Sequence, residues 1–408
     1  MARRSILATQ ERQSLLALPD NHSDFIRHYG LSEADLSLIQ QKRGDANRLG
    51  FAVQLCYMRY PGVILGVNET PDAYLLKFIA KQLKVSAQSW DDYGFREKTR
   101  REHLLELQQL FNYHTFSRNH YAEYVKYISQ FAIETDKGIV LAQQLISHLR
   151  SKRVLLPTPL VIEKICAESI TLANKTIYER LNKGLTQSHL DKLDNLLSLK
   201  DGTKITQLAW LRQSPLKPNS RQMNAHIDRL AYCLAIALPD GIERRIHQNR
   251  LLKIAREGGQ MQATDLAKFE AKRRYATLVA LVIESKATII DEIIDLHDRI
   301  IGSIFNKAKN KHQQAFVASG KSINEKVELY SLIGKALIHA KEQNIDPFDA
   351  IETILSWEEF TQSVEDAETL VQPNDFDFLP RIHDSYKTIR LYAPAMLEIL
   401  PFYAISGT

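Results

Sequence analysis

The chain has 408 residues, of which 44% are hydrophobic, so it can bury a core and is not disordered throughout. Its 16 glycines and 13 prolines are too few for an all-β sandwich or barrel, which needs a turn about every 8–12 residues. The 3 cysteines lie far apart, which argues against a disulfide framework, and no long apolar run predicts a membrane span. We therefore expect a soluble, cytoplasmic protein.

The net charge of +5 conceals an asymmetry along the chain. Residues 1–275 contain 41 Lys and Arg against 28 Asp and Glu, whereas residues 276–408 contain 12 against 20. A basic part of this kind is typical of a protein that binds a polyanion. Nucleic acid is the commonest such partner, because contacts to its phosphates release condensed counterions. Chance unevenness between two ordinary helical domains is the alternative.

Helix signals occur along the whole chain, and strict alternation of apolar and polar residues is scarce. Capping residues stand next to proline at Thr70-Pro71-Asp72, Thr158-Pro159 and Asp346-Pro347, and Ser32 with Asp35 resembles a capping box. The sequence predicts an all-α fold of consecutive small helix-turn-helix-like bundles followed by a long-helix scaffold. Breaks at prolines divide it into three small units, residues 1–65, 70–155 and 156–215, and a longer region, residues 219–408.

In the first unit, only Gly44 separates two predicted helices, residues 32–41 and 45–59. Helical spacing predicts one buried face of the second helix, formed by Leu49, Ala52, Val53 and Cys56. Side chains suited to the major groove lie off this face: Arg43, Asn47, Arg48 and Gln54. Arg pairs with guanine, and Asn or Gln pairs with adenine. The pattern fits a helix-turn-helix, although any small three-helix domain exposes such residues.

In the second unit, we expect helices over residues 71–84 and near residues 96–112. The longer helix has a predicted apolar face of Leu104, Leu107, Leu110 and Phe111, and its first turns carry Arg96, Lys98, Arg100 and Arg101. Positive charge is unfavourable at a helix N-terminus unless an anion such as phosphate binds there. A basic turn that only faces water is the alternative.

In the third unit, one helix is predicted from residue 158 and another from near Asn174. The second carries three candidate DNA-binding residues: Lys175, Arg180 and Lys183. Arginines between residues 219 and 257, Arg244 and Arg245 among them, either contact DNA or face water. Residues 275–316 contain no proline and one glycine, which predicts a long helix. Such a helix needs partners along its length, either later helices of the chain or a second protomer.

No sequence motif for nucleotide binding, zinc binding or a nucleophilic serine is present. We therefore assign no catalytic residue, no metal ligand, no cofactor and no small-molecule substrate. The alternative is an enzyme in which carboxylates distant in sequence form a metal site. The spacing of acidic residues along the sequence does not test it.

The segment from Lys42 to Gly62 closely resembles the N-terminal signature of the Tn-three family, the large replicative transposases of bacterial transposons. Three further segments extend the resemblance to about residue 397: Tyr93-Gly94-Phe95-Arg96, Leu156-Pro157-Thr158-Pro159 and Arg390-Leu391-Tyr392-Ala393-Pro394-Ala395. The resemblance therefore covers nearly the whole chain.

The resemblance implies helical units that bind double-stranded DNA at terminal inverted repeats, followed by a helical region for dimerisation. It also implies a later RNase-H-like domain in which three acidic residues hold two Mg²⁺ ions. Family members are more than twice as long as this chain, and we expect that catalytic domain to be absent from it. The expected protein is a homodimer in the bacterial cytoplasm that binds transposon ends but is inactive alone. A helical scaffold that binds protein without specific DNA binding is the alternative.

Overall fold

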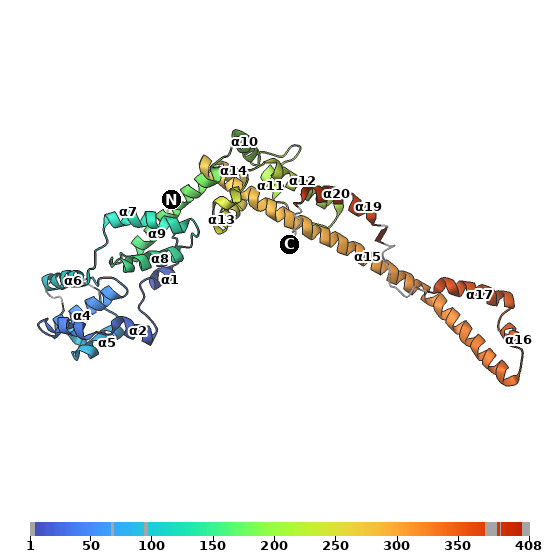
Figure 1. The fold of residues 1–408 in the computed structure, drawn as a ribbon, viewed down its shortest axis with the longest axis horizontal. Helices are drawn as coiled ribbons and strands as arrows, with labels where there is room; N and C mark the ends of the chain where they lie inside the picture. Colours follow the sequence, from blue (N-terminus) through green and yellow to red (C-terminus); the bar gives the residue numbers. More distant parts are fainter. Residues whose placement is uncertain (1–4, 67–68, 94–96, 372–381, 384, 402–408) are drawn as a thin grey trace, which may run out of the picture. The chain divides into compact units, whose positions relative to one another are not determined.

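The computed structural model describes residues 5–66, 69–93, 97–371, 382–383 and 385–401 (Figure 1). In these ranges the chain forms α-helices and short 3-10 helices, with no β-strand. The β-type pairings found there are isolated bridges, His114–Val154 and Leu199–Thr206. The predicted all-α fold is confirmed, whereas the helix-turn-helix detail is not.

Contacts between residues group the chain into two compact units. The first comprises residues 1–197 and 238–281, and the second comprises residues 198–237 and 282–408. Helix α15 (Ala271–Gln343) contributes residues to both units. The four functional ranges expected from the sequence stay predictions.

The first unit consists of short and medium-length helices that follow one another along the chain. In order they are α1 (Thr9–Ser14), α2 (His22–Tyr29), α3 (Glu33–Gln40), α4 (Asp45–Arg59), α5 (Ala73–Leu83), η1 (Ala87–Trp90), α6 (Glu97–Phe111), α7 (Arg118–Ala132), α8 (Gly138–Ser151), α9 (Pro159–Asn182), α10 (Gln187–Asn195), η2 (Ile242–Arg245), α13 (Gln248–Gly259), α14 (Ala263–Ala267) and the start of α15.

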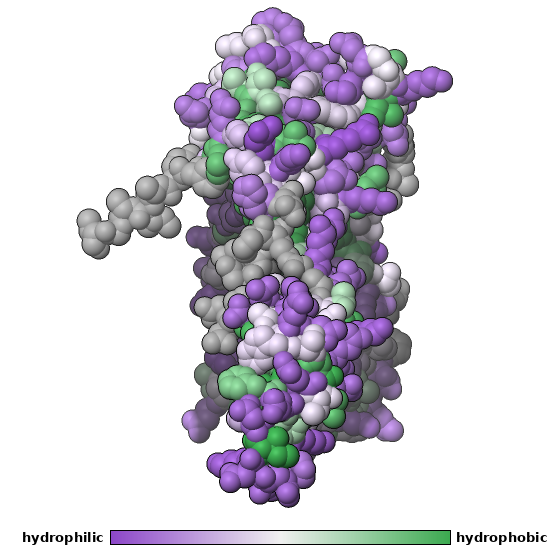
Figure 2. All heavy atoms as spheres, turned by 90° about the vertical axis from the view of Figure 1, so that its right-hand side faces the viewer, coloured by the Kyte–Doolittle hydropathy of each residue, from purple (hydrophilic) through white to green (hydrophobic). Residues whose placement is uncertain are grey.

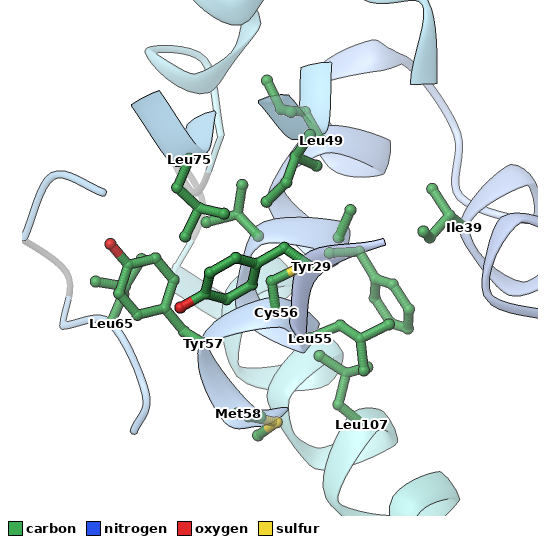
Figure 3. Close-up of a cluster of buried hydrophobic side chains, with 14 of the residues drawn as sticks. Tyr29, Ile39, Leu49, Leu55, Cys56, Tyr57, Met58, Leu65, Leu75 and Leu107 are labelled. Atoms are coloured by element: carbon green, nitrogen blue, oxygen red, sulfur yellow. The ribbon is translucent and has the colours of Figure 1, made fainter. Parts of the chain in front are cut away.

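Helix α4 lies at the centre of the first hydrophobic core. Its residues from Leu49 to Met58 are all buried, so the helix is enclosed on every side and not on one face. The predicted apolar face is confirmed, because each of its four residues is fully buried: Leu49, Ala52, Val53 and Cys56. Side chains from neighbouring elements pack around it, as Figure 3 shows for Tyr29, Ile39, Leu75 and Leu107.

Two local predictions for residues 70–155 need correction. Helix α5 begins at Ala73, and its cap is Asp72, whose Oδ1 accepts the N–H groups of Tyr74 and Leu75 at 2.9 Å; Thr70 is therefore not the cap. In α6, Leu107 is buried as predicted, but Leu110 is 51% exposed. At 100° per residue, Leu110 lies at the margin of the buried face, on the side of Leu107 away from Phe111.

Helices α7, α8 and α9 form the second hydrophobic core. Helix α9 is one continuous helix of 24 residues, so the prediction of a new helix near Asn174 was wrong. The residues around the expected break contain no glycine or proline, and two of them are packed inside: Ser169 and Ala173. The Ser169 hydroxyl donates to the Ile165 carbonyl of its own helix and lies 3.0 Å from the Val125 carbonyl of α7. Packing against α7 thus continues through the expected break.

The second unit is organised along the remainder of α15. The other helices are α11 (Gln207–Leu211), α12 (Ser220–Ala235), α16 (Pro347–Glu352), α17 (Trp357–Leu370), α19 (Tyr386–Arg390) and α20 (Ala393–Ile399). The predicted long helix is confirmed and extends beyond its predicted range at both ends, to 73 residues. Helix α17 packs back on it, since Tyr330 donates to the Ser363 carbonyl at 2.8 Å and Lys326 pairs with Asp366 at 3.0 Å.

The face seen in Figure 2 is mostly hydrophilic, with hydrophobic areas that are separate from one another. The acidic residues of α17 are all exposed to solvent: Glu358, Glu359, Glu365, Asp366 and Glu368. Among the helices that the structure describes, none combines the length and hydropathy needed to cross a bilayer.

Gly50 is expected to be intolerant of a larger side chain. A Cβ atom at this position would lie 2.1 Å from Cδ2 of Tyr93, whose ring covers the middle of α4. Gly50→Ala should therefore destabilise the first unit by about 1–3 kcal/mol, as overpacking does in a core. Hydrogen exchange of α4 peptides measures this effect. Gly302→Ala is the control, because nothing lies within 4 Å of its Cβ in α15, and it should be neutral or stabilising. An equal loss of stability in the two variants would contradict the close packing of Tyr93 against Gly50.

Asp35 on α3 and Arg59 at the end of α4 form an ion pair that ties the two helices together. Nη1 of Arg59 lies 2.9 Å from Oδ2 of the buried carboxylate. Burial alone raises the pKa of Asp35, but hydrogen bonds from Arg59 and Ser32 outweigh burial and hold the pKa below its ordinary value. A carboxyl with a lower pKa in the folded state stabilises the fold above its unfolded pKa of about 3.9. That contribution is lost as the pH falls through the folded value.

Asp35→Asn should accordingly lower the stability of the first unit near neutral pH. Breaking a buried pair costs about 3–5 kcal/mol, and we expect about 2–3 kcal/mol because Arg59 is still 28% exposed. Urea unfolding with hydrogen exchange of α3 and α4 peptides measures the difference. The gap between wild type and variant should close as the pH falls through the lowered folded-state pKa of Asp35. A gap that is independent of pH would show that the carboxylate charge does not contribute.

Candidate nucleic-acid interface

The turn between α3 and α4 presents one exposed cation and two side chains that hold the turn. Gly44 has a φ of 84°, a left-handed conformation that disfavours other residues. Arg43 before it is exposed, and no ion pair of its guanidinium occurs among the described residues. Nδ2 of Asn47 donates to the Arg43 carbonyl at 2.9 Å, and Nε of Arg48 donates to the Lys42 carbonyl at 3.0 Å. Both of these side chains are half-buried.

Gln54 does not lie on an exposed face, so this part of the prediction was wrong. Its side chain is fully buried, and its amide pairs with the backbone of Leu65 in both directions, at 3.3 and 3.5 Å. Gln54 is seven residues after Asn47 and shares its side of the helix. This side is open only at the first turn of α4 and is covered from Leu49 onward.

Of the predicted phosphate-binding residues in the first turns of α6, one is buried and two are exposed. Arg100 is buried and donates to the carbonyls of Leu65 and Gly66, so it holds the segment after α4 in place and is not an exposed phosphate ligand. Lys98 and Arg101 are exposed, with Lys98 3.9 Å from Glu102. Arg96 lies outside the described residues. The signal that we missed is helical spacing, because Arg100 precedes the buried Leu107 by seven residues.

One ion pair connects the α3–α4 turn to α6. Nζ of Lys42 pairs with the carboxylate of Glu106 and lies 4.6 Å from the ring centroid of Phe51. Helices α4 and α6 also pack directly, with the rings of Phe51 and His103 5.3 Å apart. The exposed cations of the turn and of α6 therefore belong to one packed body.

The three candidates on α9 are all exposed. Lys175 and Arg180 lie on its outer side, and Lys183 follows its last residue. Among the described residues, no ion pair of these three side chains occurs. Their positive charges therefore remain uncompensated by the protein.

The described residues offer no group of three or more His, Cys, Asp or Glu that could hold a metal ion. The thiols of Cys56, Cys166 and Cys233 are buried, and burial raises the pKa of each to about 12. Neither a metal centre nor a reactive thiol is thus assembled in this part of the chain.

Comparison with known proteins places these features in a family. Residues 6–169 match a domain described as a domain of unknown function, DUF4158. Over 99% of its length, the chain is 58% identical to the transposase for transposon Tn3926 of Escherichia coli and 59% identical to the transposase for transposon Tn21 of the same species. It is 52% identical over 99% of its length to the transposase for transposon Tn501 of Pseudomonas aeruginosa.

The chain spans 41% of the length of each of these curated relatives. Because the alignment with these relatives covers 99% of the chain, both units have counterparts in them. Over nearly its whole length the chain is therefore closely similar to transposases of the Tn-three family, and it corresponds to their N-terminal part.

Proposed function

We propose that this chain binds the terminal inverted repeats of a transposon, as the N-terminal part of a replicative transposase. One observation supports this most directly: five exposed candidate cations of the first unit have no acidic partner among the described residues, namely Arg43, Arg101, Lys175, Arg180 and Lys183. Like charges held on a surface repel one another, and a polyanion relieves that repulsion.

In this proposal, the turn before α4 reads bases and the start of α6 contacts phosphates. Arg43 has a free guanidinium that can pair with guanine, and Asn47 retains its amide oxygen for an adenine edge. Arg48 and Lys98 stay candidates, although each forms an exposed ion pair, Arg48 with Asp45 at 3.8 Å and Lys98 with Glu102 at 3.9 Å; such pairs contribute little in water. Gln54 and Arg100 are left out because both are buried.

The second unit would provide self-association, with α15 pairing two protomers. DNA cleavage and strand transfer would belong to the remaining length of the relatives, where two Mg²⁺ ions would act. We assign no catalytic residue, metal ligand or cofactor to this chain. A protein-binding scaffold is the second candidate function. It is favoured by exposed apolar side chains in the C-terminal half of α15, where Val317 is 70%, Val327 61% and Ile338 64% exposed.

Arg43→Ala combined with Asn47→Ala should relax sequence preference. Each lost bidentate base contact is worth about 1–3 kcal/mol of discrimination. Fluorescence anisotropy compares binding to a duplex that carries the terminal repeat of transposon Tn21 and to a mixed-sequence duplex of equal length. We expect the affinity ratio of the two duplexes to fall while binding to the mixed duplex changes little. An unchanged ratio would rule out base reading by this turn.

Lys98→Ala combined with Arg101→Ala should instead weaken binding to both duplexes equally. The loss of two phosphate contacts reduces the slope of log K against log salt by about two units. The control is Lys321→Ala with Lys335→Ala, which removes the same charge from exposed positions on α15. If wild type binds neither duplex in a salt-dependent manner, the chain is a protein scaffold and the DNA-binding proposal is wrong.

A further inference from the structure

The C-terminal end of α9 contacts two segments that are distant in sequence. Helix η2 packs against α9, and Arg245 donates a hydrogen bond to the Lys183 carbonyl, 62 residues away. At the start of α15, the Lys272 carbonyl accepts a hydrogen bond of 2.8 Å from Nδ2 of Asn182, 90 residues away. All three segments belong to the first unit.

These contacts bring five cations together, which we call the α9-end cluster: Arg180, Lys183, Arg244, Arg245 and Lys272. Three carboxylates accompany them. Glu179 lies 3.3 Å from Nζ of Lys272, Glu243 lies 3.6 Å from Nε of Arg244, and Oε1 of Glu270 accepts the backbone N–H of Lys272 at 3.3 Å. The two ion pairs are exposed to water, where an ion pair contributes little. Five cations against three carboxylates leave the cluster with an excess of positive charge.

Buried contacts hold the cluster in shape. Arg250 on α13, which follows η2 directly, is buried and donates to Oδ1 of Asn174 on α9. The same guanidinium lies 2.8 Å from Oδ2 of Asp136, in the segment between α7 and α8. Helix α13 is thereby fixed against α9, so the arginines of η2 are positioned by the fold.

The negative end of the α9 dipole explains only part of this arrangement. It favours a cation at the helix C-terminus and accounts for the contact of Arg245 with the Lys183 carbonyl. It does not account for Arg244, whose side chain is 88% exposed, or for Arg180, which points to water one turn earlier. An anion with several charges would stabilise all five cations together.

We propose that the α9-end cluster is a second contact with the sugar–phosphate backbone of the DNA, formed by elements other than those of the α4 and α6 site. This inference rests on the proposed DNA-binding function. Guanidinium groups bind phosphate oxygens through two parallel hydrogen bonds, and the ammonium groups of Lys183 and Lys272 bind phosphate as point charges. In this proposal the cluster adds affinity without sequence preference.

The test uses the full chain and the two duplexes described above. Arg180→Ala with Arg244→Ala should weaken binding to both duplexes about tenfold and reduce the salt slope by about two units. Glu179→Gln with Glu243→Gln should strengthen binding to both about threefold or more, because it removes two of the three negative charges of the cluster. This second variant changes only exposed side chains, so it keeps the test informative if the arginine variant is poorly folded.

Opposite effects of the two variants, with the α15 lysine variant unchanged, would support the inference. If both cluster variants bind within about twofold of wild type while the Lys98 and Arg101 variant is weakened, the inference is overturned and the proposed function stands. If wild type shows no salt-dependent binding to either duplex, the proposed function and the inference both fail.

Discussion

The enclosure of α4 is the constraint on which the first unit depends. A helix buried from Leu49 to Met58 must satisfy every polar group in that stretch internally and must fit its neighbours closely. Gln54 meets the first requirement, because its amide forms hydrogen bonds with the backbone of Leu65. Gly50 meets the second, because it has no side chain and leaves room for the Tyr93 ring. Only the first turn of the helix remains available to a partner, which concentrates any recognition by α4 at the Gly44 turn.

The same constraint separates the basic residues of the unit into two classes. Arg59, Arg100 and Arg250 are directed inward, and each joins two segments through a carboxylate, a carbonyl or an amide oxygen. Other cations, such as Arg43, Arg101 and Lys175, are exposed and would attract a polyanion. A count of Lys and Arg therefore overstates the charge that DNA would meet, and burial has to be known before a residue is assigned to an interface.

Local patterns were enough to predict much of this fold. The two helices around Gly44, the buried face of α4, the Ser32 capping box and the long helix α15 all follow from periodicity and capping residues. The resemblance of the Lys42–Gly62 segment to a transposase signature agrees with the relatives that the chain matches. The hydrogen-bond partners of Gln54 and Arg100 were not predictable in the same way, because both side chains bind the segment after α4, whose position depends on tertiary packing. The α9-end cluster is likewise a product of contacts between distant segments.

The buried thiols have a practical consequence for spectroscopy. Cys56, Cys166 and Cys233 are shielded from solvent and stay protonated well above neutral pH, so they react slowly with maleimides and similar reagents. A cysteine introduced at an exposed position would be labelled selectively without removal of the native ones. Pairs of fluorophores or spin labels attached in this way, one in each unit, would report the distance between the units with and without DNA.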